Sequence, residues 1–193
     1  LAVWTQGAIR HTSVIPIAGD QITNDIAMAL RTPTREAEDI KCKYGCALSQ
    51  LADQAETMEV AGVDDRPSRK LSRRALADVI QPRVEELYEL IQSELRRAGF
   101  EEVLSSGIVL TGGASVMPGM VELGEEIFHM PVRLGNPKYT GSLADVVQNP
   151  RFSTAYGLLL EAQAQRKRGQ KIQEKQGFKD VFDGMKSWFA KNF

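Results

Sequence analysis

The chain has 193 residues, 42% of them hydrophobic, and a formal net charge of −1. This length can bury the core of one domain, or of a domain with a substantial insertion, and the near-neutral charge argues against a nucleic-acid binder. No stretch approaches the roughly 18 apolar residues that begin to suggest a membrane-spanning helix, and no signal-peptide pattern opens the chain, so we expect a cytoplasmic protein.

The chain opens with a strand-like pattern. Residues 1–5 and 8–17 are rich in Val, Ile, Thr and Trp, and the Gln6-Gly7 pair between them predicts a β-hairpin. The first residue is Leu rather than Met and already lies inside this pattern. We therefore expect the chain to be a fragment of a longer protein.

Two helices are predicted next. Apolar residues four positions apart predict a short helix over residues 22–30, and residues 36–48 predict a second helix with Thr34 as its N-cap. Glu38 and Lys41 lie three residues apart on this second helix.

The two cysteines also fall in this region. Cys42 and Cys46 are four residues apart in a helical pattern, and with His11 and His129 distant in sequence they form no recognisable metal-ligand set. We expect both to be reduced, half-buried packing thiols.

A long helix dominates the middle of the chain. After a short predicted strand at residues 57–63 and a turn at 64–67, residues 72–98 have helical periodicity, with Gly99 as C-cap and a kink or division at Pro82. The expected inner face comprises Leu76, Val79, Ile80, Val84, Leu87, Leu90, Ile91 and Leu95. Arginines line the expected outer face.

The sharpest internal motif is GIVLTGGASVMPG at residues 107–119. A buried-type strand at residues 108–110 runs into Gly112-Gly113, and a helix begins near Pro118. Paired glycines allow close approach of a ligand, although many strand-to-helix turns use glycine for geometry alone. A further strand at residues 132–134 and a helix at residues 152–163 complete an alternating α/β pattern.

The C-terminal part combines a basic, flexible linker at residues 165–176 with an amphipathic helix at residues 177–193. The apolar stripe of this helix, at helical spacing, consists of Phe178, Val181, Phe182, Met185, Trp188, Phe189 and Phe193. Its many aromatic residues are typical of a helix that lies in a lipid headgroup layer. The helix is too short and too charged to span a bilayer. Docking on the protein's own core is the alternative.

Together these segments resemble the actin and Hsp70 ATPase superfamily and, within it, the family of the bacterial cell-division protein FtsA. The resemblance covers nearly the whole chain. It rests on IPIAGDQITNDIA, AEDIKCKYGCA, SRRALADVIQPRVEELYELI, GIVLTGGASVMPGM, PVRLGNP, RFSTAYGLLL and the aromatic C-terminal helix.

The resemblance implies an α/β fold: the second domain of an actin-like, ribonuclease H-like protein. Subdomain 2A would comprise residues 1–18 and 99–164, interrupted by a small α+β subdomain 2B at residues 19–98. The linker and the C-terminal amphipathic helix would follow.

The family binds ATP with Mg²⁺ between two domains. By position, the cofactor-binding residues would be Gly19, Glu38, Lys41, Gly112, Gly113 and Ala114. Glu38 and Lys41 would contact adenosine, the two glycines and Ala114 would pack against adenine and ribose, and Gly19 would lie near the phosphates. Because the other phosphate-binding loops are absent, we expect this fragment to bind ATP poorly or not at all, and no catalytic residue is carried over.

The family also tethers filaments of the tubulin-like protein FtsZ to the cytoplasmic face of the inner membrane, at the division site. By position, Arg83 and Glu86 match its binding surface for the FtsZ tail; Arg73 is added on physical grounds as a second cation for an acidic peptide. The alternative for Arg83 is a solvated side chain paired with Glu85 or Glu86 along the helix. The resemblance further implies binding to anionic lipids and self-association into filaments.

Two other functions stay open at this point. One is an actin-like ATPase of another lineage, of the pilus-assembly or chaperone type, whose terminal helix docks on a protein partner. The other is a nucleic-acid-binding tail, because basic residues cluster near Phe and Trp, although an apolar stripe gives little contact with phosphates.

Overall fold

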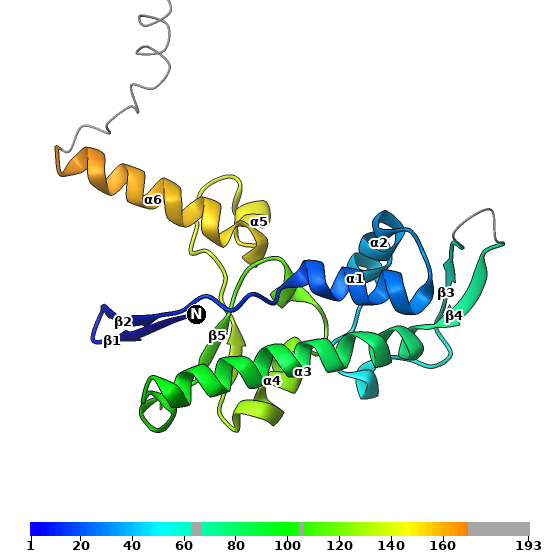
Figure 1. Cartoon of the computed structure of the whole chain (residues 1–193). Helices are drawn as coiled ribbons and strands as arrows, with labels where there is room; N and C mark the ends of the chain where they lie inside the picture. Colours follow the sequence, from blue (N-terminus) through cyan, green and yellow to red (C-terminus); the bar gives the residue numbers. More distant parts are fainter. Residues whose placement is uncertain (63–66, 105, 170–193) are drawn as a thin grey trace, which may run out of the picture. The chain divides into compact units, whose positions relative to one another are not determined.

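The computed structural model describes residues 1–62, 67–104 and 106–169 (Figure 1). The chain divides after Ser153 into two units, each described here by itself. The elements are β1 (Ala2–Thr5), β2 (Ala8–Thr12), α1 (Gly19–Leu30), α2 (Thr34–Tyr44), β3 (Thr57–Val60), β4 (Arg69–Ser72), α3 (Arg73–Arg97), β5 (Ile108–Leu110), α4 (Met120–Phe128), β6 (Val132–Leu134), α5 (Ala144–Val147) and α6 (Ser153–Lys167), with short 3-10 helices that include η3 (Ala114–Val116).

The predicted N-terminal hairpin is confirmed. β1 and β2 pair antiparallel, and Gln6 and Gly7 both have positive φ, as a tight hairpin turn requires. The second strand ends at Thr12, which pairs with Ala2, rather than at residue 17. Backbone hydrogen bonds between Ser13 and Leu1 complete the hairpin.

A hydrogen bond attaches this hairpin to α3. His11 Nε2 lies 2.9 Å from Glu94 Oε1, and Arg97 donates to the same carboxylate. The Arg97 guanidinium first, and then the hydrogen bond from His11, lower the pKa of Glu94 to about 2.

The two predicted helices after the hairpin form α1 and α2, with two boundary corrections. Thr34, the expected N-cap, is the first residue of α2; Pro33 takes the cap position, with no side-chain cap hydrogen bond. The helix ends at Tyr44 instead of residue 48, because Gly45 has an extended ψ and the chain then turns so that Ala47 N donates to Pro118 O at 2.7 Å.

The long helix α3 begins and ends close to its predicted bounds. Ser72 is its N-cap, accepting from Ala75 N. The helix runs without division through Pro82, and Gly99, expected as the C-cap, lies one residue beyond the observed cap, Ala98. There the positive φ of Gly99 and the bond from Phe100 N to Leu95 O close a Schellman motif.

The inner face of α3 is mostly as predicted. α1 and α4 pack along this helix. Leu90 is a wrong assignment, since it is 41% exposed, whereas Tyr88 was missed and is buried. The Tyr88 ring lies against Phe128, and its hydroxyl donates to Met120 O at 2.8 Å. The inner face of α3 therefore includes a polar aromatic residue, where the sequence pattern predicted only aliphatic side chains.

Among the described residues, each sheet has two strands. β3 and β4 pair antiparallel; β4 was not predicted, because its sequence Arg-Lys-Leu-Ser is mainly polar, and β3 ends at Val60, before the expected residue 63. β5 and β6 pair in parallel around α4, which confirms the strand–helix–strand unit predicted from the Gly-Gly motif.

The main core joins α1, α2, α3 and α4 with β3 and β6. Of the cysteines, Cys46 is buried but Cys42 is exposed, which corrects the expectation that both are half-buried. α6 continues to Lys167, inside the segment predicted as a linker.

Candidate functional site

A buried ammonium group organises the junction of α1 and α2. Lys41 Nζ lies 2.6 Å from Glu38 Oε2, 2.7 Å from Thr23 Oγ1 and 3.0 Å from the carbonyl oxygen of Gly19. Lys41 is only 9% exposed. Because an ammonium has three N–H donors, these three acceptors use all of its hydrogen-bonding capacity.

The Glu38 carboxylate is the hub of the same cluster. It accepts hydrogen bonds from Lys41, from the hydroxyl of Thr23 and from Cys42 Sγ at 3.4 Å. Burial opposes its ionisation, but these hydrogen bonds outweigh burial and lower the pKa of Glu38. Burial, and then the neighbouring Glu38, raise the pKa of the Cys42 thiol.

The Gly-Gly motif reaches this cluster through Ala114. A β-carbon added to Gly19 would lie 3.4 Å from Lys41 Nζ and 3.8 Å from the β-carbon of Ala114. Three predicted cofactor-binding residues from distant segments therefore meet at one point. Gly112 has a φ of +97°, and an added β-carbon would meet none of the described atoms within 4 Å, so the space beside it is open.

An open cavity of about 410 Å³ adjoins the cluster on the side of Glu38. It is lined by Asp20, Thr23, Asn24, Thr34, Arg35, Glu38 and Asp39. Three carboxylates and one guanidinium are among these lining residues, so the lining disfavours phosphates and suits groups that donate hydrogen bonds, such as ribose hydroxyls and an amino group on a base. The residues present thus fit the adenosine end of a nucleotide, and Gly112 and Gly113 do not line this cavity.

Sequence reasoning missed Thr23, which contacts both Lys41 and Glu38. The signal was present, because Thr23 stands four residues after Gly19 and therefore on the same face of α1. Its hydroxyl lies 3.1 Å from the Gly19 carbonyl oxygen.

The residues predicted to bind a partner tail are already engaged in ion pairs. Arg83 donates from Nε and Nη2 to the two carboxylate oxygens of Asp25, at 2.5 and 3.0 Å, and from Nη1 to Glu86 at 2.5 Å. Arg73 donates to Glu56 at 2.9 Å and to the Tyr44 carbonyl oxygen at 3.1 Å. Asp25, on α1, was not identified from the sequence.

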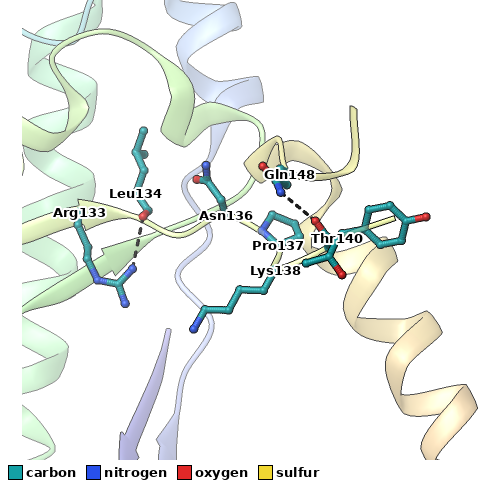
Figure 2. A pocket seen from close by; sticks show the side chains of 8 residues that line it. Arg133, Leu134, Asn136, Pro137, Lys138, Thr140 and Gln148 are labelled. Atoms are coloured by element: carbon teal, nitrogen blue, oxygen red, sulfur yellow. Dashed lines mark hydrogen bonds between the residues drawn. The ribbon is translucent and has the colours of Figure 1, made fainter. Parts of the chain in front are cut away.

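Figure 2 shows a further open cavity, of about 560 Å³, beside β6 and the loop that follows it. Arg133 and Lys138 extend toward the same side in this view, and the described lining contains no carboxylate. None of the predicted site residues lines it.

The predicted membrane-binding residues, from Phe178 to Phe193, lie outside the described residues. Within residues 1–62, 67–104 and 106–169, no helix is long and apolar enough to cross a bilayer.

A comparison with protein families decides the identity of the chain. The family model described as "Cell division protein FtsA" matches residues 1–157. The chain belongs to the FtsA family. This FtsA-family assignment excludes the pilus-assembly and chaperone lineages considered from the sequence.

Individual FtsA proteins support the assignment. FtsA of Pseudomonas aeruginosa is 63% identical over 160 residues, which are 83% of this chain and 38% of that protein. FtsA proteins of Neisseria meningitidis and Escherichia coli K12 are 45% and 42% identical over the whole chain and 48% of their own length. The chain thus spans about half the length of these relatives, or less.

The structural neighbours show an actin-like fold. MreB 5 of Spiroplasma citri bound to AMPPNP superimposes with a TM-score of 0.70 at 17% identity, over 86% of this chain and 50% of the MreB chain. The same protein bound to ADP gives a TM-score of 0.65 at 16% identity, over 88% of this chain and 52% of the other. The predicted α/β, actin-like fold class is thereby confirmed.

Proposed function

We propose that this FtsA-family chain is part of a protein that anchors FtsZ filaments to the cytoplasmic face of the inner membrane at the division site. The observation that carries the proposal is the family match over residues 1–157. It is supported by the aromatic stripe of residues 178–193, in a region that the alignments with the Neisseria and Escherichia proteins include.

Membrane binding follows from the chemistry of the tail. Full burial of one aromatic or Met side chain is worth about 1.5 to 3 kcal/mol, and each basic residue near an anionic surface adds about 1 kcal/mol. Partial burial and helix ordering remove much of this gain, and Gly184 costs about 1 kcal/mol in a helix. A single copy binds reversibly, and self-association into filaments strengthens attachment by avidity.

Replacing Trp188 by glutamate should weaken binding to anionic vesicles about tenfold or more, because it removes the largest buried ring and adds a repelled charge. Co-sedimentation of the chain with phosphatidylglycerol vesicles measures this. Trp4→Glu is the matched control, since Trp4 is an exposed aromatic residue of the hairpin, and its pelleting should not change. Equal loss in the two variants would show that binding does not use the tail.

In this proposal, ATP and Mg²⁺ bind the longer protein of which this chain is a part. Glu38 would contact adenosine, and Lys41, whose three N–H groups are already engaged, would fix the Glu38 carboxylate in place. Gly112, Gly113 and Ala114 would pack against adenine and ribose, and Gly19 would lie near the phosphates. The support is the convergence of Gly19, Lys41 and Ala114. When bound, ATP would supply a ligand shared with the rest of the longer protein, and the residues of this chain would hold mainly its nucleoside end.

The partner in this proposal is the C-terminal tail of FtsZ, at the surface that contains Arg73, Arg83 and Glu86. The support is the position of these residues within the family match. The guanidinium groups of Arg73 and Arg83 are already paired with carboxylates, so an acidic tail must compete with the protein's own side chains.

A further inference from the structure

We propose that Asp25 competes with a partner's carboxylate for Arg83, so that an acidic peptide binds this surface by displacing Asp25. The inference rests on the tail-binding function proposed above. It is carried by two ion pairs of Arg83: the pair with Asp25 connects α3 to α1, and the pair with Glu86 lies within α3.

Asp25 occupies the edge of the guanidinium best suited to a carboxylate. Nε and Nη2 of Arg83 donate side by side to its two oxygens, at 2.5 and 3.0 Å. This two-bond arrangement is the strongest way in which arginine holds a carboxylate. With Nη1 donating to Glu86, three of the five N–H groups of Arg83 are engaged, and a peptide carboxylate can form the two-bond arrangement on this edge only if Asp25 leaves.

The local charge is a second reason why an acidic peptide must compete with Asp25. Two carboxylates surround one guanidinium, so the cluster has a net charge of −1 and repels an acidic peptide. The Arg83 and Asp25 side chains are both more than a quarter exposed, so the pair lies within reach of a peptide and of water, and its exchange needs no opening of the core.

Displacement of Asp25 would also remove an ion pair that connects the middle of α1 to α3. Thr23, two residues before Asp25, holds the Lys41–Glu38 cluster, so α1 contacts both candidate sites. Occupation of Arg83 by a peptide removes the contact between α1 and α3 that this ion pair makes, which predicts faster amide hydrogen exchange in residues 19–30.

The test is the affinity of Asp25→Asn for a fluorescent synthetic peptide of the acidic FtsZ tail, measured by anisotropy on the full chain. Because the pair is partly exposed, we expect binding about twofold to fivefold tighter than in the wild type. Asp145→Asn, on an exposed residue of α5, changes the net charge equally and should leave the affinity unchanged. Arg83→Gln should weaken binding in both backgrounds.

A purely structural role for Asp25 would give the opposite sign, because loosening α1 would weaken binding. Unchanged or weaker affinity in Asp25→Asn, with wild-type binding present, overturns the competition and leaves the tail-binding proposal standing. An equal gain in Asp145→Asn overturns it too, in favour of general electrostatics. No binding by any of the variants overturns both proposals, and peptide-induced protection of residues 19–30 overturns the displacement step.

Discussion

Replacing Gly119 by alanine should lower the free energy of unfolding by about 2 to 5 kcal/mol, the sum of backbone strain and overpacking. Gly119 has a φ of +85°, and an added β-carbon would lie 2.6 Å from Leu48 N and 2.9 Å from the Leu48 β-carbon. Neither contact can relax without moving backbone, because this is where the chain after α2 meets the start of α4.

Urea denaturation of the full chain measures this loss. Gly112→Ala is the matched control, since Gly112 also has a positive φ but an added β-carbon would meet none of the described atoms within 4 Å. It should show only the strain, and Gly157→Ala, in helix α6, should be neutral or stabilising. If Gly119→Ala and Gly112→Ala lose the same stability, the close approach to Leu48 is wrong.

Lys41→Met should destabilise the fold by about 2 kcal/mol, because three hydrogen bonds of a buried ammonium are lost at about 1 kcal/mol each and the partly exposed Glu38 regains some hydration. The same change should also remove the hydrogen-bonded link that the Lys41 ammonium makes between the Gly19 carbonyl oxygen and the Glu38 carboxylate. Lys43→Met, on an exposed lysine of the same helix, is the control and should have little effect.

The stability lost in Lys41→Met should decrease at low pH. The pKa of Glu38 in the folded protein lies below its ordinary value of 4.5, so its contribution is complete above pH 4.5 and disappears as the pH falls through the folded pKa. The stability difference between wild type and Lys41→Met should therefore shrink below pH 4.5. A difference that is constant from pH 7 to pH 3 would contradict the ion pair.

The sequence predicts elements well where packing follows a simple period. Apolar residues four apart place α1, and the run Ile-Val-Leu before Gly-Gly places β5. Prediction from the sequence pattern fails where the deciding contact is polar or distant in sequence. Tyr88 is buried because it packs against Phe128 and donates to the Met120 carbonyl oxygen. β4 is a strand only because β3 pairs with it.

The same limit applies to the candidate site. The sequence marked Lys41 and Arg83 together with their neighbours on the same helix, Glu38 and Glu86, and both of these ion pairs are present. It did not mark their partners on α1. Asp25 lies 58 residues from Arg83, and Thr23 lies 18 residues from Lys41. No helical or strand period relates such positions, so only the packing of α1 against its neighbours reveals that Thr23 joins the Lys41–Glu38 pair and that Asp25 binds Arg83.

The most direct test of the anchoring proposal asks whether one chain joins the FtsZ tail to lipid. Anionic vesicles, a fluorescent FtsZ tail peptide and the full chain are mixed and sedimented. We predict that the peptide pellets only when the chain is present, and that Trp188→Glu and Arg83→Gln each prevent it, the first by leaving chain and peptide in solution and the second by leaving only the peptide. Peptide that stays in solution while the wild-type chain pellets would contradict the proposal.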